Sequence, residues 1–366
     1  MNAPFKDPAR RCMPIAEWPA GDRLCWEAAI RSGDVLDEAG PAGHWRPATR
    51  RLVAKSYGRW LTFLDHSGHL DTSASPGDRA TPVAVSDYVA SLTRTCHGQT
   101  AAMLVKGLYR ALRVMVPERD LTWLRAAARR LRARSTPTRD KTGRIRSSRD
   151  LYELGRSLMV EAEENPRIGA VRRATRYRDG LIIRILAARP LRIANFAAIT
   201  IGGHLVRTGD HYWIRFTEQE TKTHRPLEFP LPNDLTLSMD EYLGRHRSCL
   251  LAGRENPHLW ITKDGVWMRH GAIYTRIKKL TAKAFGVSVN PHLFRDCAAT
   301  SLAIEDPDHV LVATQLLGHA SLETTNRHYN QARMIDASRQ FGRTLADLRR
   351  SVLDDRRSRD RRGEYP

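Results

Sequence analysis

The sequence predicts a mainly α-helical protein that carries a small antiparallel β-sheet, an α+β arrangement, in its second half and a bundle of helices before it. Apolar residues recur at helical spacing through most of the chain, and two short strand-like runs lie between residues 211 and 231. Of the 366 residues, 41% are hydrophobic, which suits globular folding. A chain of this length has room for two ordinary domains.

Changes in composition divide the chain into five segments. The first is expected to be an extension whose short helix packs onto the next segment through Trp18, Leu24, Trp26 and Ile30. A run of Gly, Pro and Ala then interrupts the chain. The expected segments are an N-terminal extension (1–45), a helical domain (46–133), a basic linker (134–148), a second domain (149–350) and a charged tail (351–366).

Four helices are expected in residues 46–133. The start of the second is marked by Thr81 followed by Pro82, the third stops before Pro117, and the fourth begins after Asp120. The first carries an apolar stripe made of Val53, Tyr57, Trp60, Leu61 and Leu64. The exposed positions of the fourth are basic, namely Arg125, Arg129, Arg130 and Arg132. These arginines suit contact with DNA, but they would also serve simply to keep the surface of a bundle solvated.

The linker continues this basic character. From Arg125 to Arg149 there are ten Lys or Arg residues and one acidic residue. A solvated linker is one interpretation. Because the linker joins two segments that are candidates for DNA contact, we favour contacts of Lys141, Arg144 and Arg146 with the phosphate backbone. Such contacts position a protein on DNA without reading the base sequence.

The second domain is expected to mix helices with two short strands. The basic helix at 270–285 could reach a major groove, but an exposed basic face is equally consistent. The expected elements are helices at 151–163, 171–188 (buried), 235–251, 270–285 and 335–353, strands at 211–216 and 227–231, and a short strand at 259–261.

Bulk composition restricts the function further. The net charge of +20 implies a polyanionic partner, and nucleic acid is the first candidate. The five cysteines are scattered and form no C-x-x-C pair, which argues against a structural zinc site and fits a reducing cytosol. The N-terminus has no apolar signal core, and no apolar run approaches the roughly 18 residues of a membrane span.

Residues 289–330 are the most informative part of the sequence. Asn290 can cap a helix whose first position is Pro291. His292 and Arg295 stand three residues apart, so a helix places both on one face near its N-terminus. Two basic side chains and the positive end of a helix dipole suit an anion.

The same stretch continues with Leu317-Gly318-His319 and then Tyr329. Each piece alone is common, but this order within a short segment is much more specific. In this order the motifs resemble the C-terminal signature of the tyrosine recombinases, also called phage integrases. Here Tyr329 stands one residue later after the histidine than in most members of that family.

The resemblance extends to two earlier sites. Leu191-Arg192-Ile193 matches the place of the family's first catalytic arginine, with Asn195 where members usually have an acid. Lys222, between the two expected strands, matches the catalytic lysine, and nearby Arg225 is expected to contact DNA only. The six family positions are Arg192, Lys222, His292, Arg295, His319 and Tyr329.

The activity of the family implies a reaction. Tyr329 would attack the scissile phosphorus, and the two arginines would bind the non-bridging oxygens. Lys222 would protonate the departing 5′ oxygen, while His292 and His319 would assist as base or hydrogen-bond donors. The product would be a 3′-phosphotyrosine, so neither a metal, ATP nor another cofactor is required.

The resemblance therefore implies a site-specific DNA recombinase or integrase of a mobile genetic element. It would close as a two-domain clamp on double-stranded DNA and act as a homotetramer on paired sites, alone or with partner recombinases, at the nucleoid in the bacterial cytoplasm. Two alternatives stay open. One is a catalytically silent DNA-binding accessory or regulatory protein of the same fold, and the other is a topoisomerase-like or telomere-resolving enzyme.

Overall fold

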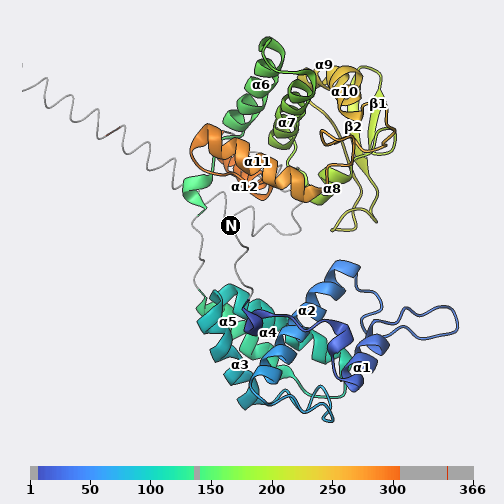
Figure 1. The fold of residues 1–366 in the computed structure, drawn as a ribbon, viewed down its shortest axis with the longest axis vertical. Helices are drawn as coiled ribbons and strands as arrows, with labels where there is room; N and C mark the ends of the chain where they lie inside the picture. The colour runs from blue at the N-terminus through green and yellow to red at the C-terminus, as the bar shows by residue number, and fades with distance from the viewer. Residues whose placement is uncertain (1–6, 136–140, 306–343, 345–366) are drawn as a thin grey trace, which may run out of the picture. The chain divides into compact units, whose positions relative to one another are not determined.

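The chain divides into two units, Met1–Asp140 and Lys141–Pro366, each with an apolar core of its own. The computed structural model describes residues 7–135, 141–305 and 344 (Figure 1). The helix expected at 335–353, apart from residue 344, and the charged tail lie outside the described residues. Within the described part of the chain, no helix is long and apolar enough to cross a membrane.

The first unit is helical. The prediction of four helices in residues 46–133 is confirmed, and so is the cap expected at Thr81. The Thr81 hydroxyl accepts a hydrogen bond from the Ala84 amide (3.2 Å), and the Asp120 carboxylate accepts one from the Thr122 amide (2.9 Å). The elements are the 3-10 turns η1 (Pro8–Arg10) and η2 (Ile15–Glu17) and the helices α1 (Ala20–Ile30), α2 (Pro47–His66), α3 (Pro82–Thr95), α4 (Gly98–Met115) and α5 (Thr122–Arg134).

Aromatic side chains join α1 to the core of this unit. Trp18 packs edge-on against Trp26 and Tyr57, with ring centroids 5.9 and 4.9 Å apart, and all three are buried. The prediction for Leu24 is wrong, since this side chain is 67% exposed. Asp22 is buried instead. It accepts a hydrogen bond from the Tyr57 hydroxyl (2.7 Å) and forms an ion pair with Arg79.

The second unit combines helices with a small sheet, as predicted. In Figure 1, α6 and α7 lie side by side. The helical elements are η3 (Thr142–Arg144), α6 (Ser148–Glu164), α7 (Ala170–Ala188), α8 (Ile193–Ala198), η4 (Asn233–Leu235), α9 (Thr236–Glu241), the π-helical turn η5 (Tyr242–His246), α10 (Arg247–Leu251), α11 (His270–Phe285) and α12 (Pro291–Glu305).

The sheet is antiparallel with the order β1-β2-β3, formed by β1 (Leu205–Thr208), β2 (His211–Phe216) and β3 (Leu227–Pro230). Ile214 of β2 is opposite Leu205 of β1 and Phe229 of β3. The sequence did not predict β1, a strand of four residues. The strand expected at 259–261 is wrong as well. These residues are fully buried, but only Ile261 pairs, in an isolated β-bridge with Trp267, and they form no ladder.

The helix α7 runs through the core of the second unit, which confirms the prediction that it is buried. Its charged residues in the core have partners. Asp179, which is 1% exposed, accepts two hydrogen bonds from Arg178 (2.6 and 3.1 Å) and pairs with Arg276 of α11. This ion pair joins Arg276 of the basic helix to the core. The C-terminal end of α7 leads directly to Arg192 and α8.

The buried Asp22 should be essential for the stability of the first unit. Asp22→Asn removes the negative charge that faces the buried Arg79, and we expect a loss of about 3 kcal/mol in the free energy of unfolding. Urea denaturation followed by tryptophan fluorescence measures this change. The control is Asp65→Ala, which replaces an exposed aspartate of α2 and should leave the free energy of unfolding unchanged. A change below about 1 kcal/mol for Asp22→Asn would contradict this assignment.

Candidate active site

Helix α12 begins as the sequence predicts. The Asn290 side-chain oxygen accepts hydrogen bonds from the backbone amides of His292 (3.0 Å) and Leu293 (3.1 Å), which confirms the cap. His292 is exposed in the first turn. Arg295 lies one turn further along the helix and is only 9% exposed. The cap therefore fixes where the helix starts and, with it, the positions of both basic residues.

Arg295 connects α12 to the turn before α8. Its Nη1 donates a hydrogen bond to the Pro190 carbonyl (2.7 Å). Burial and the positive charge of Arg192 lower the pKa of Arg295 to about 10, although Asp296 opposes this shift. The two guanidinium groups are thus close enough to repel each other. An anion that binds both guanidinium groups, such as a phosphate, would relieve this repulsion.

Lys222 is exposed on the loop between β2 and β3. The preceding Thr221 is buried, and its hydroxyl bridges the backbone of Arg225, accepting from the amide (3.1 Å) and donating to the carbonyl (2.7 Å). His224, which lies between Thr221 and Arg225 in the sequence, adopts a left-handed conformation with φ of 50°. The result is a tight turn that presents the Lys222 side chain to solvent.

A side chain of α8 joins this loop to the turn that carries Arg192. The Asn195 amide donates a hydrogen bond to the Glu220 carbonyl, at 3.3 Å. Asn195 stands where family members usually have an acid. In this chain its amide N–H donates to the backbone of the loop that carries Lys222. An ionised carboxylate at this position could not make the same contact, because it has no hydrogen to donate.

Glu220 forms the base of the same loop, a role that no sequence motif indicated. Its carboxylate accepts hydrogen bonds from the Thr217 amide (2.8 Å) and hydroxyl (2.9 Å), and it is 2.8 Å from the His204 Nε2 atom. The Thr217 amide, followed by His204, lowers the pKa of Glu220 to about 2. Glu220 is therefore ionised at neutral pH, and the ionised carboxylate can accept all of these hydrogen bonds.

The described residues include four of the six predicted catalytic positions, and all four belong to the second unit. Arg192 and Arg295 are close to each other. Asn195 links their turn to the loop of Lys222, and His292 shares α12 with Arg295. His319 and Tyr329 lie outside the described residues.

The predicted DNA contacts fall into two groups. Arg225 and the four predicted arginines of α5 are exposed. Arg125, Arg129 and Arg132 also line a groove of about 630 Å³ between α4 and α5. Lys141, in contrast, bonds to Asp296 in the second turn of α12, and Arg144 bonds to Ser288 just before this helix. The Arg146 guanidinium bonds to carbonyls of its own segment.

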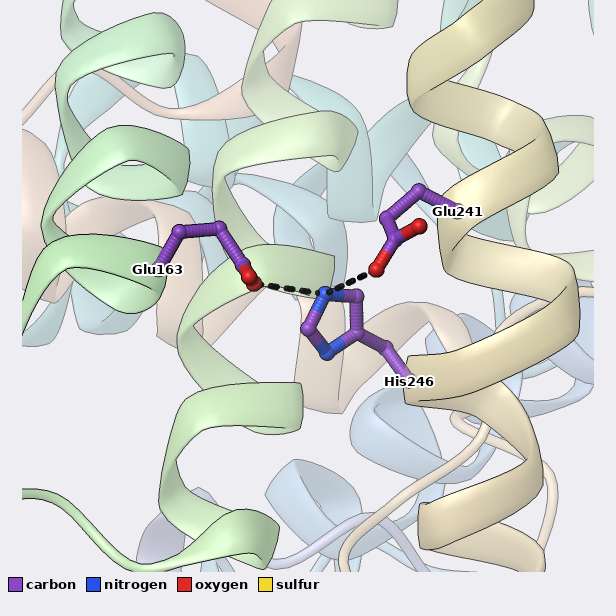
Figure 2. A group of neighbouring side chains, drawn as sticks. All are labelled: Glu163, Glu241 and His246. Atoms are coloured by element: carbon purple, nitrogen blue, oxygen red, sulfur yellow. Dashed lines mark ion pairs between the residues drawn. The ribbon is translucent and has the colours of Figure 1, made fainter. Parts of the chain in front are cut away.

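One cluster of the described residues has the spacing to hold a metal ion, and it contains none of the predicted catalytic residues (Figure 2). The His246 Nε2 atom is 2.9 Å from Glu163 and 3.9 Å from Glu241. Burial lowers the pKa of His246. Arg245 pairs with both carboxylates, at 2.7 and 2.9 Å, so a cation already occupies the cluster. The cluster connects the end of α6 to η5.

Residues 158–335 match the phage integrase family, and this range includes all six predicted catalytic positions. Residues 158–335 therefore belong to the phage integrase family, the tyrosine recombinases.

Two solved structures are similar. The XerH site-specific recombinase is 15% identical with a TM-score of 0.54 over 92% of this chain and 97% of that chain. The XerA recombinase is 18% identical with a TM-score of 0.38 over 82% and 94%. No curated protein sequence matches. The similarity to XerH shows a shared fold.

The ionisation of Glu220 provides a test of the loop geometry. The pKa is lowered on folding, so the loop is stabilised above about pH 4.5, and this contribution is lost as the pH falls towards 2. A carbon NMR titration of the Glu220 carboxyl group should give a midpoint near 2. His204→Ala should raise the midpoint, and Thr217→Val should raise it by loss of the hydroxyl alone. A wild-type midpoint near 4.5 would contradict the arrangement.

Proposed function

We propose that the protein is a site-specific DNA recombinase that cuts and rejoins DNA through a 3′-phosphotyrosine intermediate. The observation that carries this proposal is the contact of Arg295 with the Pro190 carbonyl beside Arg192. The positive charge of Arg192 acts on the Arg295 guanidinium, which supports a shared task for these two groups. Paired guanidinium groups match the geometry of a phosphate and remain charged at all physiological pH values.

Each residue would have a separate task. Tyr329 attacks the scissile phosphorus and forms the phosphotyrosine bond, while the bond to the 5′ oxygen breaks. Lys222 donates the proton that the departing 5′ oxygen requires, and His292 and His319 act as base or as hydrogen-bond donors to the phosphate. Arg192 and Arg295 stabilise the charge on the non-bridging oxygens. Each donor of this kind can lower the activation free energy by roughly 3 kcal/mol.

The energy of the broken phosphodiester would be kept in the phosphotyrosine bond. Attack on that bond by a 5′-hydroxyl of the partner strand reverses the first step and releases Tyr329. The reaction balances without ATP, a metal or another cofactor. Phenol has a pKa of about 10 in water, so the nearby cationic residues would also favour the phenolate in the attack.

DNA would be bound by both units. Its phosphates are the natural partner of a chain with net charge +20. The candidates for phosphate contact are Arg225 in the second unit and, on α5 of the first unit, Arg125, Arg129, Arg130 and Arg132. We propose that the first unit is the core-binding domain of a two-domain clamp. The XerH structure was determined bound to palindromic difH substrate, in a post-cleavage complex, which supports this proposal.

Recombination joins two sites, so we propose a homotetramer on paired DNA sites, with or without partner recombinases. Action on a mobile genetic element in the bacterial cytoplasm, at the nucleoid, is part of the same proposal. A palindromic substrate such as that of XerH has two-fold symmetry, which a pair of identical subunits can match.

Trapping of the covalent intermediate tests the reaction. The wild type is incubated in EDTA with a nicked duplex selected for binding from the DNA that flanks its own gene, and denaturing gels are read for protein-linked DNA. We expect an adduct with the wild type and with Tyr274→Phe, an exposed tyrosine of α11, but none with Tyr329→Phe.

The other outcomes separate the alternatives. An adduct that survives Tyr329→Phe would place the nucleophile elsewhere. Tight binding without any adduct would favour a silent DNA-binding protein. An adduct that leads to relaxation of a supercoiled plasmid without exchange of partner strands would favour a topoisomerase-like enzyme. Loss of the adduct in EDTA alone would contradict a metal-free reaction.

A further inference from the structure

Residues 141–148, which we name the strap, lie along the helix that carries Arg295. The Lys141 Nζ atom is 3.0 Å from an Asp296 carboxylate oxygen, and the Ser148 amide donates to the Ser301 hydroxyl at 2.8 Å. The Arg146 amide is 3.4 Å from the Cys297 sulfur. Successive residues of the strap therefore contact successive positions of α12.

The strap is also joined to the segment just before this helix. The Arg144 guanidinium donates two hydrogen bonds to the Ser288 carbonyl, at 3.0 and 2.8 Å. A fork of two parallel donors on one acceptor fixes the direction of the side chain as well as its distance. Arg144 thus secures the strap near the N-terminal end of α12, where His292 lies.

Asp296 has an electrostatic consequence for the phosphate site. Its side chain is 11% exposed and directly follows Arg295, and it raises the pKa of that guanidinium. A carboxylate at this position attracts the same guanidinium that the phosphate requires, and it repels the phosphate itself. Lys141, which is 55% exposed, brings a positive charge to Asp296 from the solvent side.

We propose that Lys141 is a positioning residue for catalysis. By pairing with Asp296, it offsets the negative charge of this carboxylate next to Arg295, so that the carboxylate competes less with the scissile phosphate for the guanidinium. Its role differs from the contact with DNA that the basic composition of the linker suggests. This inference rests on the proposed function, since it assigns the effect of Lys141 to the phosphate site of that reaction.

The charge of Asp296 can be removed together with that of Lys141, which makes the inference testable. Single-turnover cleavage at saturating protein is measured with the nicked duplex, and DNA affinity is measured separately. Lys141→Ala should slow cleavage by about fivefold, which corresponds to roughly 1 kcal/mol, and should change affinity little. Lys141→Ala with Asp296→Asn should restore the wild-type rate, and Lys141→Arg should keep it.

A matched control separates local pairing from net charge. Glu305 is an exposed acid at the far end of α12, about 13 Å from position 296 at the rise of an α-helix and beyond the screening length of about 8 Å. Lys141→Ala with Glu305→Gln has the same net charge as the rescuing pair but should remain slow. Thermal melting of each variant confirms that it folds.

The opposite results would overturn the inference. If Lys141→Ala with Asp296→Asn is as slow as Lys141→Ala, or if affinity falls equally in both, Lys141 contacts the DNA. The side-chain Nε resonance of Arg295 gives a readout that needs no cleavage. It should shift in Lys141→Ala and return in the double variant, and an unchanged resonance would count against the inference. Absence of an adduct with the wild type would count against the proposed function alone.

Discussion

The burial of Arg295 beside Arg192 is the interaction on which the arrangement of the second unit depends. A cation close to another cation is not stable in a protein interior unless the surrounding residues fix it there. Leu293 and Phe294 precede Arg295 on α12, Cys297 follows it, and all three are buried in the core. Their apolar burial brings the guanidinium to the Pro190 carbonyl, which takes up one of its donors. The apolar residues around Arg295 therefore determine where its guanidinium group lies.

The charged groups of the site differ in how firmly they are fixed. Arg295 is buried and bonded to the backbone, while Lys222 and His292 are exposed at the turn of a loop and the first turn of a helix. This difference matches their proposed tasks. Stabilisation of charge requires donors that do not reorganise during the reaction, whereas proton transfer requires side chains that can reach a substrate. Asn195 and Glu220 connect the two groups through the loop backbone.

Local features of the sequence were sufficient to predict most of the helices. The α2 stripe, the cap at Thr81 and the cap at Asn290 depend only on residues within a few positions of each other, and all three are confirmed. Features that depend on distant partners were not predictable. Asp22 meets Arg79, and β1 is a strand only because β2 lies beside it. The basic composition of the linker likewise contained no indication that Lys141 and Arg144 bond within their own unit.

The central claim is that Arg192 and Arg295 act as one phosphate-binding unit. The most direct test compares single-turnover cleavage rates of Arg192→Ala, Arg295→Ala and the double variant, all at saturating protein. Because each arginine requires the other to hold the phosphate, the double variant should be no more than about threefold slower than the slower single variant. Rate losses that multiply would show that the two arginines act independently, and this result would contradict the account.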